Sequence, residues 1–241
     1  MRLTTSIDSF ADTGYVAGLG NGYVLPITQD PNDLVTKSGA QTITGAKKFG
    51  TDTNNSTFEA DGTYKANGSA TTFEDINFSL VPATGGSATP ATIAFNGDAR
   101  LKCVAFSGTN PIPDEIPTST EILHRYKEGS DIEIHIHMLT TTADVGDVKM
   151  QLRYAWYNMD STPSAATTVA QTKTTPGVAW SPMNFEWVIS GSGKQAQSRL
   201  VYSIFRDPTD AADTYTHAMA ATDYGVHIEA DTLGSRTIHA K

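Results

Sequence analysis

The stretch DIEIHIHML, residues 131–139, brings together residue types that bind metal ions. Its residues alternate between apolar and polar, so a β-strand directs Glu133, His135 and His137 to one face and the isoleucines to the other. Two histidines with this spacing have Cα atoms about 6.6–6.8 Å apart and point in the same direction. Both imidazoles could therefore reach one Zn2+ ion or a similar metal.

A metal centre needs a third and a fourth ligand, and the sequence offers four candidates. Glu133 lies on the same strand face, His227 and Glu229 alternate in a second run, VHIEA, and His124 precedes the first run. The residues of the two runs reach one ion only if their strands are neighbours. The alternative is a polar strand face that contacts solvent or another subunit. We favour this alternative and predict no metal and no cofactor. An intermediate possibility is a structural ion on an oligomer axis, where copies of one histidine from several chains bind it together.

No other motif has the spacing that catalysis requires. SGSGKQAQS is similar to a phosphate-binding loop, but Val188 replaces its first glycine and Gln195 follows Lys194 where Ser or Thr is needed. GLGNGYV lacks the dinucleotide-binding spacing, and neither G-x-S-x-G nor H-E-x-x-H occurs. The single cysteine, Cys103, lies in the apolar run LKCVAFS and is interpreted as a buried thiol. We predict no catalytic residues and no enzymatic activity.

The histidine strand belongs to a series of alternating runs that predict an all-β fold. The clearest is DVKMQLRYAWY, residues 147–157, in which every second residue is apolar. The other predicted strands lie within 74–82, 100–107, 183–190, 198–206, 223–230 and 236–240. About eight strands with long connections favour a jelly-roll-like antiparallel β-sandwich.

The connections between these strands have their own signals. Residues 82–92 and 161–177 are polar and rich in Pro, Gly, Ser or Thr, and are predicted as exposed loops. A short helix is predicted within 207–223, because Pro208 suits the first helical position. In DTLGSR, residues 231–236, Gly234 permits a left-handed turn that sets the register of the last strand.

The composition excludes two classes of partner. The net charge of −9 and the pI near 5.0 exclude nucleic acid, whose binding requires clustered Lys and Arg. No stretch reaches the ~18 apolar residues that span a bilayer, and the N-terminus lacks the apolar core of a signal peptide. We expect synthesis in a cytoplasm and no insertion into a membrane.

The first 70 residues differ from the rest of the chain. Short apolar runs such as YVLPI are scattered among Gly, Asn, Asp and Thr, with little to bury. Such a segment docks on a partner or becomes ordered by winding with copies of itself. We predict an extended anchor at 1–35, a stalk for oligomerisation at 36–70 and a β-sandwich head at 71–241.

Residues 34–51, LVTKSGAQTITGAKKFGT, resemble an element found repeatedly in tail fibres and related surface proteins of tailed bacteriophages, T-x-x-Q-T-I-x-G-x-K-x-F. The positions that match it are Gln41, Thr42, Ile43, Gly45, Lys47 and Phe49. The resemblance implies a homotrimer in which apolar residues of three chains meet on the axis and glycine permits the turn. On this interpretation Ile43, Gly45 and Phe49 make the oligomerisation contacts.

Two further segments, HRYKEGSDIEIHIHM and YGVHIEADTLGSR, resemble the C-terminal domain of phage virion proteins encoded among tail or head structural genes. Together with residues 34–51 they cover under a fifth of the chain. The resemblance implies a structural protein of a tailed-phage virion, namely a homotrimeric fibre, spike or decoration protein on tail or head. It implies a place on the virion surface after synthesis in the host cytoplasm, with the N-terminus attached to other capsid or tail proteins. It provides no catalytic residues.

A head of this kind presents loops that contact the host surface. Exposed aromatic rings stack on sugars, and Tyr157 and Trp180 are the candidates for contact with a host glycan, since Tyr154 and Trp156 fall on an apolar strand face. Two alternative functions stay open. One is a metal-dependent or glycan-degrading virion enzyme that uses the histidine face, and the other is a free carbohydrate-binding module that needs neither anchor nor trimer.

Overall fold

A computed structural model of the chain describes residues 46–80 and 90–234. Contacts divide the chain into two units, Met1–Ala46 and Lys47–Lys241, and every described strand belongs to the second. The strands are β1 (Lys47–Gly50), β2 (Asn55–Phe58), β3 (Tyr64–Asn67), β4 (Thr72–Phe78), β5 (Ala91–Phe95), β6 (Asp98–Phe106), β7 (Asp114–Glu121), β8 (Ile132–Thr140), β9 (Asp147–Tyr157), β10 (Thr167–Thr174), β11 (Pro182–Ile189), β12 (Arg199–Arg206) and β13 (Met219–Ala230). The predicted anchor, Ile43 and Gly45 lie outside the described residues. Within the described ranges, no helix is long and apolar enough to span a bilayer.

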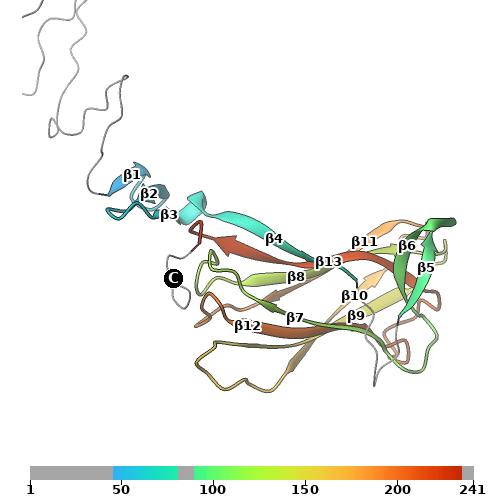
Figure 1. The fold of residues 1–241 in the computed structure, drawn as a ribbon. Helices are drawn as coiled ribbons and strands as arrows, with labels where there is room; N and C mark the ends of the chain where they lie inside the picture. The colour runs from blue at the N-terminus through green and yellow to red at the C-terminus, as the bar shows by residue number, and fades with distance from the viewer. Residues whose placement is uncertain (1–45, 81–89, 235–241) are drawn as a thin grey trace, which may run out of the picture. The chain divides into compact units, whose positions relative to one another are not determined.

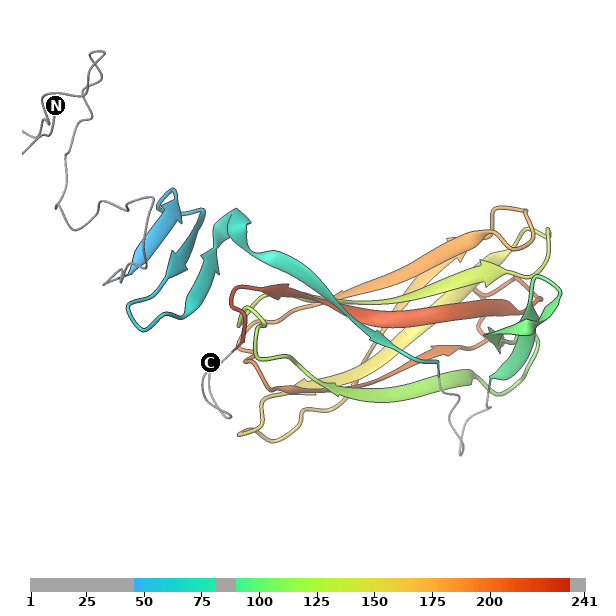
Figure 2. The same cartoon turned by 45° about the horizontal axis from the view of Figure 1, so that its top comes forward.

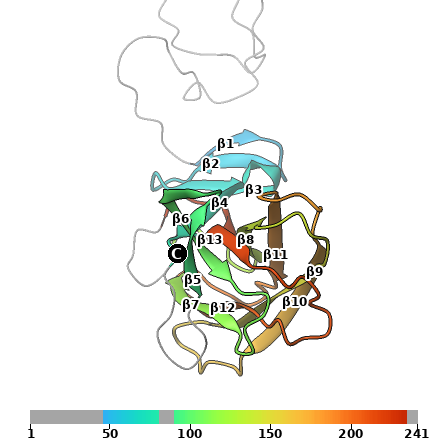
Figure 3. The same ribbon diagram turned by 90° about the vertical axis from the view of Figure 1, so that its right-hand side faces the viewer.

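Eight of these strands form a jelly roll of two antiparallel layers, which face each other in Figures 1 and 3. One layer has the order β4-β13-β8-β11 and the other has the order β7-β12-β9-β10. Successive strands alternate between the layers except β9 and β10, which form a hairpin, and this alternation is the jelly-roll pattern. The hairpin β5-β6 lies between β4 and β7 in sequence and extends the first layer. The all-β, jelly-roll-like sandwich predicted from the sequence is confirmed.

Strict alternation of apolar residues creates the core between the layers. The apolar face of β8, formed by Ile132, Ile134, Ile136 and Met138, is buried and packs with residues such as Leu152 of the opposite layer. Burial of each such side chain stabilises the fold by about 1.5–3 kcal/mol. Cys103 is also buried, on β6, as predicted. The polar face of β8 is thereby fixed on the outside of the sandwich.

Strand β13 lies in the middle of its layer and has two different neighbours along one edge. Its first residues, Met219–Ala221, pair with β6, and Tyr224–Ala230 pair with β4 (Figure 2). Between them the register shifts by one residue at Thr222. A bulge of this kind reverses the alternation, so that Asp223, Gly225 and His227 share the outer face with the histidines of β8.

Two predictions about the connections are wrong. Residues 161–177 are not wholly a loop, because Thr167–Thr174 form β10, an edge strand whose pattern is polar since only Val169 packs against the core. Residues 207–223 do not form a helix, because the backbone carbonyls of Tyr215 and His217 accept hydrogen bonds from the buried Arg206 side chain.

The strand predictions are confirmed for seven runs, and the eighth, 236–240, lies outside the described residues. The alternating pattern does not reveal β5 or β7. Strand β7 contains Pro117 and lies at a sheet edge, where proline is tolerated and one-sided burial is weak. Gly234 has a positive φ of 144°, and the last strand, whose register its predicted turn would set, lies outside the described residues.

Residues within the predicted stalk form a separate small sheet, β1-β2-β3. Asn55 and Thr57 are buried on one face, while the aromatic rings of Phe49, Phe58 and Tyr64 are gathered on the other. The main-chain N–H of Ala66 on β3 donates a hydrogen bond to the carbonyl of Asp231, 2.6 Å away, just after β13. The small sheet is therefore hydrogen-bonded to the end of the sandwich.

Candidate functional site

The candidate site lies on the outer face of three neighbouring strands, β4, β13 and β8. In the register of β8 and β13, His135 is opposite Gly225 and Glu133 is opposite His227. In the register of β13 and β4, His227 is opposite Asp75. The two histidine-bearing runs are therefore neighbours, as a shared metal site requires.

Three side chains from the three strands form a compact group, namely Asp75, His135 and His227. Their potential ligand atoms all lie within 4.8 Å of one another. The Asp75 carboxylate is 3.9 Å from His135 Nε2 and 3.6 Å from His227 Nε2. The two imidazole rings are 4.3 Å apart between centroids. These separations exceed hydrogen-bond length, so the group is close but not directly bonded.

Glu133 orients the His227 ring through Nδ1, whereas Nε2 is the nitrogen that lies near Asp75. A carboxylate oxygen of Glu133 lies 2.9 Å from His227 Nδ1. A hydrogen bond between them places the proton of a neutral imidazole on Nδ1, because an ionised carboxylate only accepts. The lone pair of Nε2, which lies 3.6 Å from the Asp75 carboxylate, is then available to a metal, as in metal-ligating histidines whose other nitrogen donates to a carboxylate.

His135 differs from the solvent-facing position that the alternating pattern predicts. The side chain is fully buried although it lies on the outer face of the sheet, because the rings of His137 and His227 pack against it at centroid distances of 4.9 and 4.3 Å. Neither ring nitrogen has a hydrogen-bond partner among the described residues. Burial lowers the pKa of His135 and the neighbouring His227 lowers it further, so the imidazole is held neutral with a free lone pair.

His137 is engaged elsewhere. Its Nδ1 lies 2.9 Å from a carboxylate oxygen of Asp223, and the side chain is half exposed. The hydroxyl of Thr222, the bulged residue, donates a second hydrogen bond to the same oxygen of Asp223 at 2.9 Å. The predicted pair of His135 and His137 is thus replaced by His135 and His227.

Gly225 gives the ring of His135 access to Asp75 across the intervening strand. A Cβ atom at this position would lie 2.7 Å from Asp75 Oδ1 and 2.9 Å from His135 Cε1. Any side chain on Gly225 therefore collides with the group. The sequence pattern did not identify Asp75 or Gly225 as members of the group. The alternation in EDINFSL does, however, place Asp75 and the apolar Ile76 on different faces of the strand.

The other two predicted ligands lie apart from this group. Glu229 accepts a hydrogen bond from Lys127 Nζ at 2.8 Å and another from Thr71. Burial raises the pKa of Glu229, but these hydrogen bonds together lower it below its ordinary value. His124 lines a different pocket, of about 440 Å3, beside the ion pair of Glu121 and Arg199.

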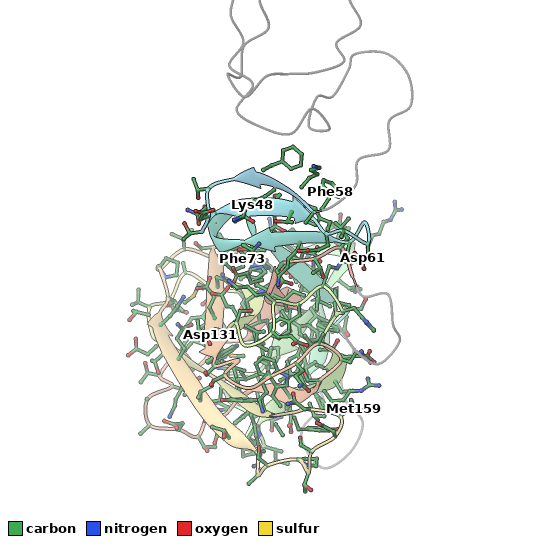
Figure 4. All side chains as sticks on the ribbon, turned by 90° about the vertical axis from the view of Figure 1, so that its left-hand side faces the viewer. Lys48, Phe58, Asp61, Phe73, Asp131 and Met159 are labelled. Carbon is green, nitrogen blue, oxygen red and sulfur yellow. The ribbon has the colours of Figure 1, made fainter. Side chains whose placement is uncertain are left out.

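A shallow hollow of about 210 Å3 adjoins the group on the same face. It is lined by Phe73, Asp131, Ile132, Glu133, Val188 and His227. Phe73 and Val188 are 77% and 67% exposed, which is unusual for large apolar side chains on a sheet face. Figure 4 labels two of the lining residues, Phe73 and Asp131.

The two predicted surface aromatics are half-buried. Trp180 has a left-handed backbone, with a φ of 59°, and its ring contacts Phe95 with centroids 5.5 Å apart. Tyr157 ends β9. On the same strand Trp156 is buried and Tyr154 is partly buried against the core, as their apolar face predicts.

No protein-family model and no curated protein matches the chain. Among solved structures, it is similar to the enzymatically active domain of tailspike protein 4 of bacteriophage CBA120, with 9% identity and a TM-score of 0.31 over 67% of this chain and 19% of that chain. It is also similar to the CBM22-2 xylan-binding domain of Paenibacillus barcinonensis Xyn10C, with 10% identity and a TM-score of 0.35 over 57% of this chain and 84% of that domain. A third similar structure is an Arthrobacter globiformis T6 isomalto-dextranase complexed with panose, with 14% identity and a TM-score of 0.36 over 68% and 24% of the two chains.

Proposed function

We propose that this chain is a structural protein of the surface of a tailed-phage virion, a homotrimeric fibre, spike or decoration protein on tail or head, and not an enzyme. Residues 1–35 attach it to other capsid or tail proteins. The small sheet takes part in joining three copies, and the jelly-roll head faces outward. The head contacts the host surface through its loops and edges.

The observation that carries this proposal is the aromatic face of the small sheet. Phe49 closes the fibre-like element of residues 34–51, and it is 63% exposed in the single chain. Its ring meets Phe58, itself 49% exposed, in an edge-to-face contact with centroids 6.3 Å apart. Figure 4 labels Phe58 on this sheet. Two adjacent exposed aromatic rings are expected where other copies of the chain cover them.

The absence of catalysis in this proposal follows from the roles of the acidic groups near the histidines. Glu133 is bound to His227, and Asp75 lies between two imidazoles. Both carboxylates are thus engaged with imidazoles, and the resemblance to virion proteins supplies no catalytic residue.

Light scattering on a sizing column tests the assembly. A trimer of the 25.7 kDa chain has a mass of about 77 kDa (3 × 25.7). We expect the full-length protein to elute at this mass and the double variant Phe49→Ser, Phe58→Ser to elute near the mass of one chain with a folded head. Leu101→Ser is the matched control, since Leu101 is 54% exposed on β6 of the sandwich, and it keeps the trimer.

Two results would contradict the proposal. One is a monomeric full-length protein, and the other is a double variant that remains trimeric. Attachment is tested separately by deleting residues 1–35, which leaves the small sheet in place, and measuring incorporation into virions. A truncated protein that is still incorporated would remove the anchor from the proposal without affecting the trimer.

A second candidate function, sugar binding by the head, is favoured by Phe73. Its exposed ring borders the hollow that Glu133 and His227 line, and an aromatic ring beside polar groups is suited to stacking on a sugar. Affinity electrophoresis on immobilised host glycans compares Phe73→Ala with the half-buried candidates Tyr157→Ala and Trp180→Ala. If glycan no longer retards one of the three variants, the sugar contact is assigned to the residue replaced in that variant. If wild type and all three variants migrate equally with and without glycan, sugar binding by the head is excluded.

A further inference from the structure

The group formed by Asp75, His135 and His227 has the donor set of a transition-metal site. Imidazole nitrogens together with one carboxylate bind Zn2+ and related ions, with bonds of about 2.0–2.2 Å. Tetrahedral bonds of that length place neighbouring ligand atoms about 3.3–3.4 Å apart. The Asp75 carboxylate is 3.6 Å from one imidazole nitrogen and 3.9 Å from the other, and all three ligand atoms lie within 4.8 Å of one another, so side-chain rotations bring them to this spacing.

A second, independent observation points to a ligand. His135 is fully buried, its side chain is aimed at Asp75, and both of its ring nitrogens are without a hydrogen-bond partner in the described part of the chain. Buried polar groups in native proteins are normally satisfied, and an unsatisfied one marks a missing partner. A metal ion bonded to Nε2 supplies that partner.

The surroundings also fit an ion. Glu133 holds the proton of His227 on Nδ1, which leaves Nε2 as a donor atom, and Gly225 leaves space between the imidazoles and the carboxylate. A hydrogen-bonded cluster would not need this space, because the three groups would then approach to bonding distance.

From these observations we infer that Asp75, His135 and His227 bind one divalent transition-metal ion of the Zn2+ class within each chain. The imidazole donors exclude Ca2+ and Mg2+, which take oxygen ligands. Three protein ligands leave a fourth position to water or an external ligand. The ion joins strands β4, β8 and β13 and so fixes β4, which follows the small sheet in sequence, to the sandwich.

This inference is independent of the assembly, since all three ligands come from one chain. It therefore differs from an ion on a trimer axis, which would be bound once per three chains. The metal content per chain separates the two cases.

Titration calorimetry of the full-length, chelator-treated protein with Zn2+ tests the inference, together with metal analysis of the dialysed protein. Wild type is expected to bind one Zn2+ per chain, and His227→Ala and Asp75→Asn to weaken binding at least 100-fold. Glu133→Gln, which removes only the group that orients His227, is expected to weaken it 10–100-fold. His137→Ala is the matched control, because His137 lies beside His135 but is bonded to Asp223, and it keeps full affinity.

A thermal unfolding scan keeps the test independent of packing defects. Asp75 and His227 are partly exposed, so their variants fold, and Zn2+ is expected to raise the melting temperature of wild type and of His137→Ala but not of the two ligand variants. No stoichiometric binding by wild type, unchanged affinity in His227→Ala or Asp75→Asn, or one ion per three chains would each overturn the inference.

Discussion

Replacing Arg206 by Met is expected to destabilise the head more than any exposed charge change. The guanidinium of Arg206 is fully buried at the end of β12 and makes two hydrogen bonds of 2.8 Å to the Asp213 carboxylate. It also donates to the backbone carbonyls of Phe106, Tyr215 and His217. This one side chain therefore joins β6 and the segment before β13 to the opposite layer.

The magnitude follows from what the substitution leaves behind. Asp213 is as buried as Arg206, so the variant keeps a buried carboxylate without its cation. Removing one partner of a buried pair costs about 3–5 kcal/mol. In a chain of this size each kcal/mol lowers the melting temperature by about 2–4 °C, which predicts a fall of about 6–20 °C.

Arg199→Met on the same strand is the control. Arg199 lies 3.2 Å from Glu121 with both side chains about half exposed, and an exposed pair of this kind contributes about 0–1 kcal/mol. Thermal and urea unfolding of both variants, followed by near-ultraviolet circular dichroism, measure the difference. Equal melting temperatures for Arg206→Met and Arg199→Met would refute the reasoning, because the buried network would then contribute no more than a surface pair.

Three further predictions concern the outer face and the end of the last described strand. Gly225→Ala is expected to cost about 1–3 kcal/mol and to abolish Zn2+ binding, because its Cβ would collide with His135; calorimetry showing normal binding would exclude the collision. Glu229→Gln is expected to destabilise the head at pH 7. Because the pKa of Glu229 is lowered on folding, its carboxylate stabilises the head above the ordinary pKa of 4.5, and this contribution is lost as the pH falls through the folded-state pKa. Urea unfolding should therefore show a difference in unfolding free energy between wild type and Glu229→Gln at pH 7 that disappears at acid pH. Gly234→Ala is expected to cost about 1 kcal/mol, because alanine is strained at a φ of 144°, and an unchanged melting temperature would contradict this.

The local pattern of the sequence is sufficient for most of the strands. Alternation in DIEIHIHML and DVKMQLRYAWY is strict because each strand has one face in the core, and both runs form strands at the predicted places. Where this constraint is absent the prediction fails, as in the edge strand Thr167–Thr174, which buries little and reads as a polar loop. The helix prediction for residues 207–223 fails for another reason, because the buried Arg206 side chain just before this segment donates hydrogen bonds to its carbonyls.

The chemistry of the outer face was only partly contained in the sequence. The identity of His135 and His227 as possible partners follows from their alternation, but their meeting depends on β8 and β13 being neighbours. Asp75 joins them only because β4, near the start of the described chain, pairs with the last described strand. The burial of His135 depends in turn on Gly225 and on two neighbouring rings.

The sequence by itself therefore determined the all-β class, the strands with one buried face and the acidic charge, which predicts that the chain does not bind nucleic acid. These properties depend on residues close together in the chain, whose periodicity and charge act locally. Only the tertiary structure decided the layer order, the group of Asp75, His135 and His227, and the buried pair of Arg206 and Asp213. The physical reason is that strand pairing and burial are set by the packing of the whole sandwich, and packing brings together side chains whose separation along the chain carries no local signal.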